Sequence, residues 1–110
     1  MNTRTTMTGH KDIGINMNSI FKMDCLKLMP KIKDKSIDLI IADLPYGTTK
    51  NEWDNIIPFK QMWKQFNRII KDNGAILLFA QPPFNIKLAA SNMEMYRYDW
   101  VWEKPVQVDF

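Results

Sequence analysis

A carboxylate, a proline and a tyrosine lie close together in the middle of the chain, at Asp43, Pro45 and Tyr46. An ionised aspartate only accepts hydrogen bonds, and a proline has no N–H but keeps a carbonyl oxygen. A tyrosine ring offers a flat face for stacking. Together these groups can hold the exocyclic amino group of a nucleobase, because two acceptors take its two N–H bonds while the ring lies against the base. An ordinary strand-to-turn sequence of the form Asp-x-Pro-Tyr-Gly is the alternative explanation.

The element that must position these residues is the run before them, residues 37–42. Its sequence, Ile-Asp-Leu-Ile-Ile-Ala, is short, mostly apolar and rich in β-branched side chains, which is typical of a buried parallel strand. Asp43 then follows the carboxyl end of that strand, which is where open α/β sheets bind their ligands.

Residues 43–49, together with Trp53 and Asp54, resemble a motif of the amino-group DNA methyltransferases. That motif reads (Asp/Asn/Ser)-Pro-Pro-(Tyr/Phe/Trp), and here Leu44 replaces the first proline. The longer run is similar to the phage and prophage branch of these enzymes, which has a permuted order. In that branch the catalytic motif comes first, and a target-recognition region and a Phe-x-Gly-x-Gly segment follow. The resemblance extends over about residues 17–105 and covers only the N-terminal half of such an enzyme.

The resemblance implies a site-specific DNA methyltransferase, as in restriction-modification systems. Such an enzyme transfers a methyl group from S-adenosylmethionine to adenine N6, with cytosine N4 as the second choice. The target base must be flipped out of double-stranded DNA. Asp43 and the Pro45 carbonyl would accept the two N–H bonds, and Tyr46 would stack on the base and so contact DNA. Asp43 and Leu44 would also lie beside the cofactor. Catalysis would consist mainly of positioning, without a covalent enzyme intermediate.

Two other functions stay open. One is methylation of amino groups in RNA or on a protein glutamine, although the glutamine enzymes usually begin their motif with asparagine, so Asp43 argues against them. The other is a non-catalytic remnant, or half of a split enzyme that acts as an interaction module with a second chain supplying the missing half.

A second segment, Asp24-Cys25-Leu26, resembles the Gly-Asp-(Cys/Ala/Ser)-Leu segment that precedes the catalytic strand in the same enzymes. The aspartate of that segment lies near the adenine of S-adenosylmethionine, so the resemblance assigns Asp24 and Cys25 to the cofactor. Met23 stands in place of the glycine. Helix capping alone also explains Asp24, because aspartate is a preferred residue immediately before a helix. Cys25 is not preceded by proline and does not look like the nucleophile of a cytosine-C5 methylase.

Glycine placement sets an expectation about the cofactor pocket. The four glycines are Gly9, Gly14, Gly47 and Gly74, and no two of them form Gly-x-Gly. A nucleotide cofactor normally needs a glycine turn where backbone can approach it closely. We therefore expect an incomplete pocket. The predicted organisation is a flexible N-terminal arm over residues 1–16 and a catalytic-motif portion over residues 17–110, truncated before the target-recognition and glycine-rich segments.

The remaining pattern predicts an α/β fold, namely a partial Rossmann-like, S-adenosylmethionine-dependent methyltransferase domain. Parallel central strands with flanking helices are expected, about four strands and three helices in all. The predicted strands are residues 19–23, 37–42, 75–80 and 98–103, and the predicted helices are residues 25–31, 58–73 and 85–93. In the second helix, apolar residues recur at i, i+3, i+4 and i+7 and predict a core-facing stripe. The last strand alternates Tyr98, Trp100 and Trp102 with polar or smaller residues.

Two further residues are candidates for DNA contact. Trp53 lies in the loop after Gly47 and either closes over a flipped base or packs that loop. Lys104 follows a Tyr-x-Trp-x-Trp-Glu run that is common in the same enzymes. It either approaches phosphate or is an exposed lysine near the end of the sequence.

Composition bounds these possibilities. Hydrophobic residues make up 45% of the chain and charged residues 25%, which is ordinary for a soluble globular protein. No run is long enough to span a bilayer. One cysteine excludes an internal disulfide, and with a single histidine a Cys/His metal site is not expected. We therefore expect a cytoplasmic protein of a bacterial or phage-infected cell. A net charge of +3 and a pI near 9.0 permit a polyanionic partner such as DNA without requiring one.

Overall fold

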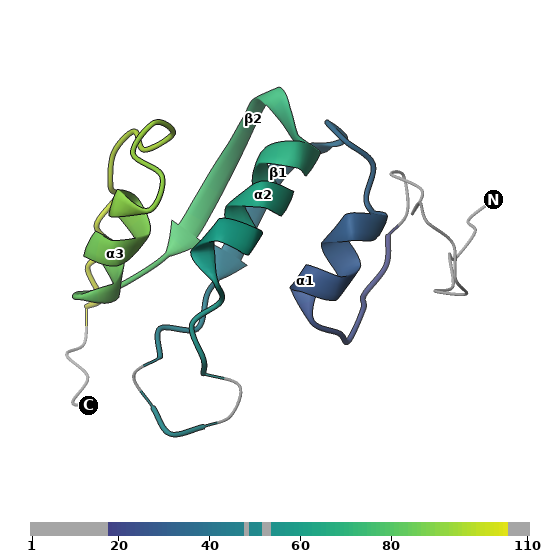
Figure 1. Ribbon diagram of the computed structural model, residues 1–110. Coiled ribbons are helices and arrows are strands. Elements are labelled where there is room, and N and C mark those ends of the chain that lie inside the picture. The colour runs from purple at the N-terminus through teal and green to yellow at the C-terminus, as the bar shows by residue number, and fades with distance from the viewer. Residues whose placement is uncertain (1–17, 48, 52–53, 106–110) are drawn as a thin grey trace.

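A computed structural model describes residues 18–47, 49–51 and 54–105, and Figure 1 shows a parallel pair of strands with helix α2 lying across it. Helix α1 lies to one side of α2 and helix α3 to the other. The elements follow in the order α1 (Cys25–Leu28), the 3-10 helix η1 (Met29–Lys31), β1 (Ile37–Asp43), α2 (Phe59–Ile69), β2 (Ile70–Phe79) and α3 (Phe84–Ala90).

Strand β1 confirms the strand that the apolar run predicts. It pairs with β2 in parallel, and the register sets Ile41 beside Leu77 and Asp43 beside Phe79. Since β1 and β2 are joined through α2, the predicted strand–helix–strand unit is present. Both carboxyl ends therefore lie at the same edge of the sheet, which is the edge where Asp43 ends β1.

The boundary between α2 and β2 differs from the prediction of a helix continuing to residue 73. Helix α2 ends at Ile69, and Ile70 already pairs with Ile37 of β1. The last carbonyls of α2, on Arg68 and Ile69, accept hydrogen bonds of 2.9 Å from the backbone N–H groups of Lys35 and Ser36. The segment that leads into β1 thus satisfies the end of the helix, and the chain turns directly into β2.

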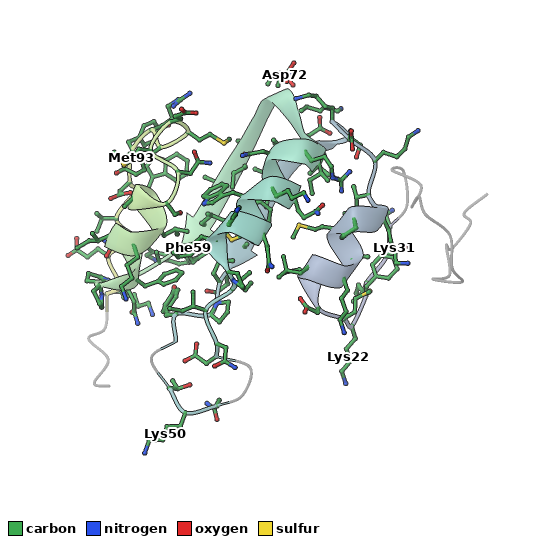
Figure 2. All side chains as sticks on the ribbon, viewed as in Figure 1. Lys22, Lys31, Lys50, Phe59, Asp72 and Met93 are labelled. Carbon is green, nitrogen blue, oxygen red and sulfur yellow. The ribbon has the colours of Figure 1, made fainter. Side chains whose placement is uncertain are left out.

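Residues 71–74 bulge out of strand β2. Ile37 pairs with Ile70, but Leu39 pairs with Ala75, so β2 advances five residues where β1 advances two. The tip of this bulge carries Asp72, as Figure 2 shows, and its carboxylate forms a 2.7 Å ion pair with Lys35. Asn73-Gly74, predicted to end a helix, is part of the bulge instead.

The core lies between α2 and the near face of the sheet. Met62 has no exposed surface, and Phe66 and Ile69 are buried on the same side of α2, which confirms the predicted stripe. Ile40 and Ala42 of β1 and two residues of β2 pack against this cluster. The other buried members are Met29, Leu44, Phe84 and Leu88.

The N-terminal helix is confirmed as α1 followed directly by η1. The Asp24 carboxylate accepts a 2.9 Å hydrogen bond from the Leu26 N–H and so caps α1. At the other end, the Arg68 guanidinium of α2 donates to the carbonyls of Met29 and Ile32, at 2.6 and 2.7 Å. This arginine ties α2 to the end of η1.

Two predicted strands do not form. Residues 19–23 and 98–103 contain neither helix nor strand, so the described part of the chain has two strands rather than about four. Tyr98, Trp100 and Trp102 are all mostly exposed. Alternating sequence alone does not make a strand, because a strand needs a partner for its backbone groups.

The far face of the sheet is apolar and largely exposed, and the Trp102 ring lies 6.3 Å from the ring of Phe79 at its carboxyl end. It carries Leu39 and Ile41 from β1 and Leu77 and Phe79 from β2, with exposed fractions of 47%, 60%, 37% and 43%. Parallel sheets normally bury both faces. Within the described ranges, no helix has the length and apolar character needed to cross a membrane.

Candidate active site

The candidate site begins at the last residue of β1, Asp43, whose side chain is exposed. The next residue, Leu44, is buried in the core. The burial of the Leu44 side chain anchors the chain just as it leaves the sheet. Pro45 and Tyr46 follow at intermediate burial. The four residues therefore lie together at the carboxyl edge of a parallel strand, as the sequence predicts, with the carboxylate outward and the leucine inward.

The Tyr46 ring is supported from behind by helix α3. Its centroid lies 5.2 Å from that of Phe84, with the planes tilted by 33°. Phe84 in turn lies 5.8 Å from Phe59, the first residue of α2. Because one side of the Tyr46 ring is occupied by a buried phenylalanine, a stacked ligand has only the other side available. Figure 2 labels Phe59 at the start of α2, in the direction of α3.

The hydroxyl of Tyr46 is electrostatically coupled to the neighbouring carboxylate. Burial raises the pKa of the Tyr46 phenol above its ordinary value, and the negative charge of Asp43 raises that pKa further. Tyr46 therefore stays protonated at neutral pH. The site presents a neutral aromatic ring beside an exposed aspartate.

A buried carboxylate, Asp54, holds the loop after Tyr46. Its Oδ1 accepts a 3.1 Å hydrogen bond from the Gly47 N–H, and its Oδ2 accepts a 2.7 Å bond from the Thr49 N–H. Gly47 has φ of +74°, a value that glycine adopts without strain. A Cβ added there would lie 2.8 Å from a side-chain carbon of Ile56.

Of the four residues that the resemblance assigns to the cofactor, Asp43 and Leu44 belong to the site itself, whereas Asp24 and Cys25 lie at the start of α1. Cys25 and Leu44 line one open cavity of about 320 Å³ between α1, β1 and α2. Burial raises the pKa of the Cys25 thiol, and the charge of Asp24 raises it further, so this group is a neutral thiol at pH 7. The Asp24 carboxylate is exposed and already caps α1.

S-adenosylmethionine does not fit this cavity as the described residues form it. The lining contains no charged side chain to pair with the amino and carboxylate groups of its methionine portion. It also contains no glycine, so it lacks the glycine turn through which backbone usually approaches a nucleotide. Apolar walls alone match only the flat and aliphatic parts of such a molecule.

Trp53 and Lys104 are the two further DNA contacts that the sequence predicts. Trp53 lies outside the described residues. Lys104 is exposed on a segment without helix or strand. Among the residues that the structure describes, no group of three or more His, Cys, Asp or Glu side chains is arranged to hold a metal ion.

Two residues of the site were not singled out from the sequence. Asp54 belongs to the quoted motif but receives no role from the sequence, and Phe84 lies just outside the helix predicted over residues 85–93, although the structure begins α3 at this residue. The single signal for Asp54 is an acidic residue that follows a glycine turn by a few positions. Phe84 lies 38 positions after Tyr46, and nothing in the sequence marks the two rings as partners.

Comparison with known proteins supports the resemblance read from the motifs. The chain is 28% identical over 102 residues to the Type II methyltransferase M1.MboII of Moraxella bovis, a match that covers 82% of this chain and 38% of the relative. It is 28% identical over 114 residues to the Type II methyltransferase M.HinfI of Haemophilus influenzae, covering 80% and 32%.

A third relative, the Type II methyltransferase M2.MboI of Moraxella bovis, is 31% identical over 80 residues, covering 53% of this chain and 29% of the relative. The chain thus spans well under half the length of these relatives. No protein-family model matches the sequence. No solved structure matches it significantly either. The chain is similar to Type II methyltransferases over most of its length.

Proposed function

We propose that this chain carries the amino-group-binding part of a DNA methyltransferase that acts on adenine N6. One observation carries the proposal: Asp43, Pro45 and Tyr46 lie together at the carboxyl edge of a parallel strand, in a chain similar to Type II methyltransferases. Asp43 is exposed and Tyr46 is partly exposed, so both can be reached by a base.

In this proposal two oxygens hold the amino group. The Asp43 carboxylate accepts one N–H bond of the adenine N6 and the Pro45 carbonyl accepts the other. In free adenine the nitrogen lone pair is delocalised into the ring. Two acceptors placed out of the base plane favour a pyramidal nitrogen, whose lone pair is available for attack. S-adenosylmethionine supplies the electrophilic methyl group when it is bound.

Tyr46 supplies the stacking surface. A base in duplex DNA must leave the helix to reach this edge, at a cost of a few kcal/mol. Stacking on an aromatic side chain contributes about 1–3 kcal/mol per base, as judged by alanine substitution, and so offsets part of that cost. Because Phe84 supports one side of the Tyr46 ring, the base would lie on the opposite side. The net charge of +3 favours approach to DNA.

The cofactor part of the proposal is limited to an incomplete site. Asp24, Cys25, Asp43 and Leu44 would form one side of it, and the remaining contacts would come from residues beyond those described. We therefore expect the 110-residue chain alone to bind S-adenosylmethionine weakly and to methylate little. Isothermal titration tests this point, and micromolar binding by the purified chain would contradict it.

The reaction is tested by grafting. Residues 37–58 would replace the aligned segment of M1.MboII, and transfer of tritiated methyl groups to duplex DNA and to RNA would be measured. We expect the graft to methylate DNA. Asp43→Asn within it should lower kcat by about 10²-fold, as expected when a group that stabilises the transition state is removed. The proposal would be contradicted by a folded graft that does not methylate DNA, or by one whose kcat is unchanged when Asp43 is replaced by asparagine.

The choice of adenine is tested on the chain itself with nucleosides. Deoxyadenosine, deoxycytidine and N6,N6-dimethyldeoxyadenosine would be titrated into ¹⁵N-labelled chain while the Gly47 amide signal, next to Tyr46, is followed by NMR. Deoxyadenosine should shift this signal most. The dimethylated nucleoside has no N–H bond to donate, so it should bind more weakly even though it stacks equally well. Equal shifts by both adenine nucleosides would show that the amino group is not recognised.

A further inference from the structure

We propose that Asp54 is a positioning residue, whose carboxylate fixes the backbone after Tyr46 and thereby aims the Pro45 carbonyl and the Tyr46 ring. The inference rests on the function proposed above and adds a residue to the same site. Asp54 lies 11 positions beyond the catalytic aspartate, and the resemblance assigns it no role.

Burial separates Asp54 from the other carboxylates. Its exposed fraction is 5%, and Ser36 is the only other polar residue that is buried among those the structure describes. Burying a carboxylate is costly unless its oxygens are hydrogen-bonded. Here both oxygens accept backbone N–H bonds, from Gly47 and from Thr49. A buried charge that binds the loop backbone with both oxygens fixes the shape of that loop.

The geometry links this carboxylate directly to the candidate catalytic residues. The Gly47 N–H that donates to Asp54 belongs to the peptide group that Tyr46 and Gly47 share. Fixing the plane of this peptide group fixes the rotation of the chain after Tyr46. The Pro45 carbonyl belongs to the preceding peptide group, which is joined to the fixed one only through the φ and ψ torsions of Tyr46, and the pyrrolidine ring restricts φ on the other side of Pro45.

Two further contacts restrict the same point. Gly47 is held at positive φ, and Ile56 leaves no room for a Cβ there. On the other side, Phe84 packs against the Tyr46 ring. Tyr46 is therefore held at its backbone by Asp54 and at its ring by Phe84. Asp43 is exposed and Asp54 is buried. In this proposal the Asp43 carboxylate contacts the base, and the Asp54 carboxylate supports the loop.

The test replaces Asp54 with asparagine in the graft and in the full 110-residue chain. Asparagine has almost the same size but only one acceptor oxygen, and its NH₂ group would face one of the two backbone N–H groups. We expect kcat of the graft to fall about 10²-fold, the scale of loss that follows from misplacing reacting groups by about 1 Å. The KM for S-adenosylmethionine should stay within about twofold, because Asp54 is not among the residues assigned to the cofactor.

Asp38→Asn is the matched control. Asp38 is also on the grafted segment, but its side chain is exposed and pairs with Lys71. The same chemical change there should leave kcat and the Gly47 amide signal as they were. In the labelled chain, Asp54→Asn should shift the Gly47 and Thr49 amides and weaken deoxyadenosine binding about tenfold.

A second variant protects the test from loss of folding. Gly47→Ala disturbs the same backbone from the other side, since its Cβ would meet Ile56, and it should lower kcat while leaving the Asp54 side chain intact. Folding of each variant is checked by its melting temperature. If either folded variant keeps kcat within twofold of the parent graft, the inference is overturned. If the Asp43→Asn graft also keeps the kcat of the parent graft, the proposed function is wrong. If only the Asp54→Asn and Gly47→Ala grafts keep it, the positioning role alone is wrong.

Discussion

The Tyr46 ring serves two purposes at once, because it packs on Phe84 and offers its other side to a ligand. Tyr46→Phe keeps both, whereas Tyr46→Ala removes both. We expect Tyr46→Phe to unfold at the same urea concentration as the parent chain. Tyr46→Ala should lose about 2 kcal/mol of unfolding free energy, less than a fully buried aromatic ring would cost, and about tenfold in deoxyadenosine affinity.

A matched aromatic truncation away from the site separates these effects. Tyr98 is largely exposed and contacts only the ring of Trp100 among the described aromatic residues. Tyr98→Ala should change neither the urea midpoint nor nucleoside affinity. Loss of affinity in both alanine variants would indicate non-specific stacking rather than a site at Tyr46.

The Cys25 thiol gives a second prediction for a single residue. Its pKa is raised from 9.0 mainly by burial and secondly by the Asp24 charge. Asp24→Asn removes that charge but keeps a good helix cap, because asparagine caps as well as aspartate does. We expect iodoacetamide to alkylate Cys25 slowly at pH 8, and Asp24→Asn to shift the alkylation midpoint to lower pH. The shift should be partial, since burial is the larger cause.

The same raised pKa has a consequence for stability. A group that holds its proton more tightly in the folded chain stabilises the fold fully below its unfolded pKa, and this contribution is lost as pH rises through the folded pKa. Unfolding free energy attributable to Cys25 should therefore decline above about pH 9. Cys25→Ser should flatten the decline, as urea titrations between pH 7 and pH 10 would measure. An unchanged slope would show that the thiol does not titrate differently in the two states.

At the scale of elements, the bulge of β2 depends on Gly74. A Cβ at this position would lie 2.8 Å from Ile70 side-chain carbons and 2.9 Å from the Asp38 backbone oxygen. The backbone oxygen cannot move aside without disturbing β1. We expect Gly74→Ala to destabilise the chain by about 1–3 kcal/mol, the usual scale for overpacking, as measured by urea unfolding. Asn73→Ala, at the exposed neighbouring position, is the control and should cost less than about 0.5 kcal/mol.

The pattern of apolar residues correctly predicted the strand and the helix that position the site. It was wrong where a backbone hydrogen-bond partner determines whether a segment is a strand or a helix. The apolar run before Asp43 and the stripe of α2 predicted a strand and a helix correctly, since each buries a face whose period is readable. The apolar pattern of α2 continues through Ile70, yet Ile70 pairs with Ile37 as strand. Residues 98–103 alternate like a strand but have no neighbouring strand among the described residues. The spacing of apolar residues along the chain does not show which segment supplies the hydrogen-bond partners.

The candidate site divides in the same way. Asp43, Pro45 and Tyr46 were predictable because they are contiguous and follow a strand. Asp54 and Phe84 act through contacts that the sequence does not mark: the loop carboxylate binds two backbone N–H groups five and seven positions before it, and the Phe84 ring packs on a ring 38 positions before it. The motif indicates the residues proposed to contact the ligand, Asp43, Pro45 and Tyr46. The residues that support them, Asp54 and Phe84, are identified only from the structure.

At the scale of the whole molecule, one face of the sheet is covered by α2 and the other is largely exposed. Helix α2 covers Ile40 and Ala42, while Leu39, Ile41, Leu77 and Phe79 face away from it and are exposed. A two-stranded sheet is marginal in water without further packing, and a contiguous exposed apolar patch favours association. The open apolar cavity beside β1 extends this surface to the outer edge of the sheet.

We therefore expect the purified 110-residue chain to self-associate through this largely exposed face. The double variant Ile41→Thr/Leu77→Thr keeps side chains that suit a strand but makes the centre of the face polar. It should shift the sedimentation coefficient at high concentration towards that of a monomer, with an unchanged far-UV circular dichroism spectrum. Ile86→Thr changes a comparably exposed residue on α3, away from the sheet, and should leave association as it was. Equal effects of the sheet and helix variants would mean that association does not use this face.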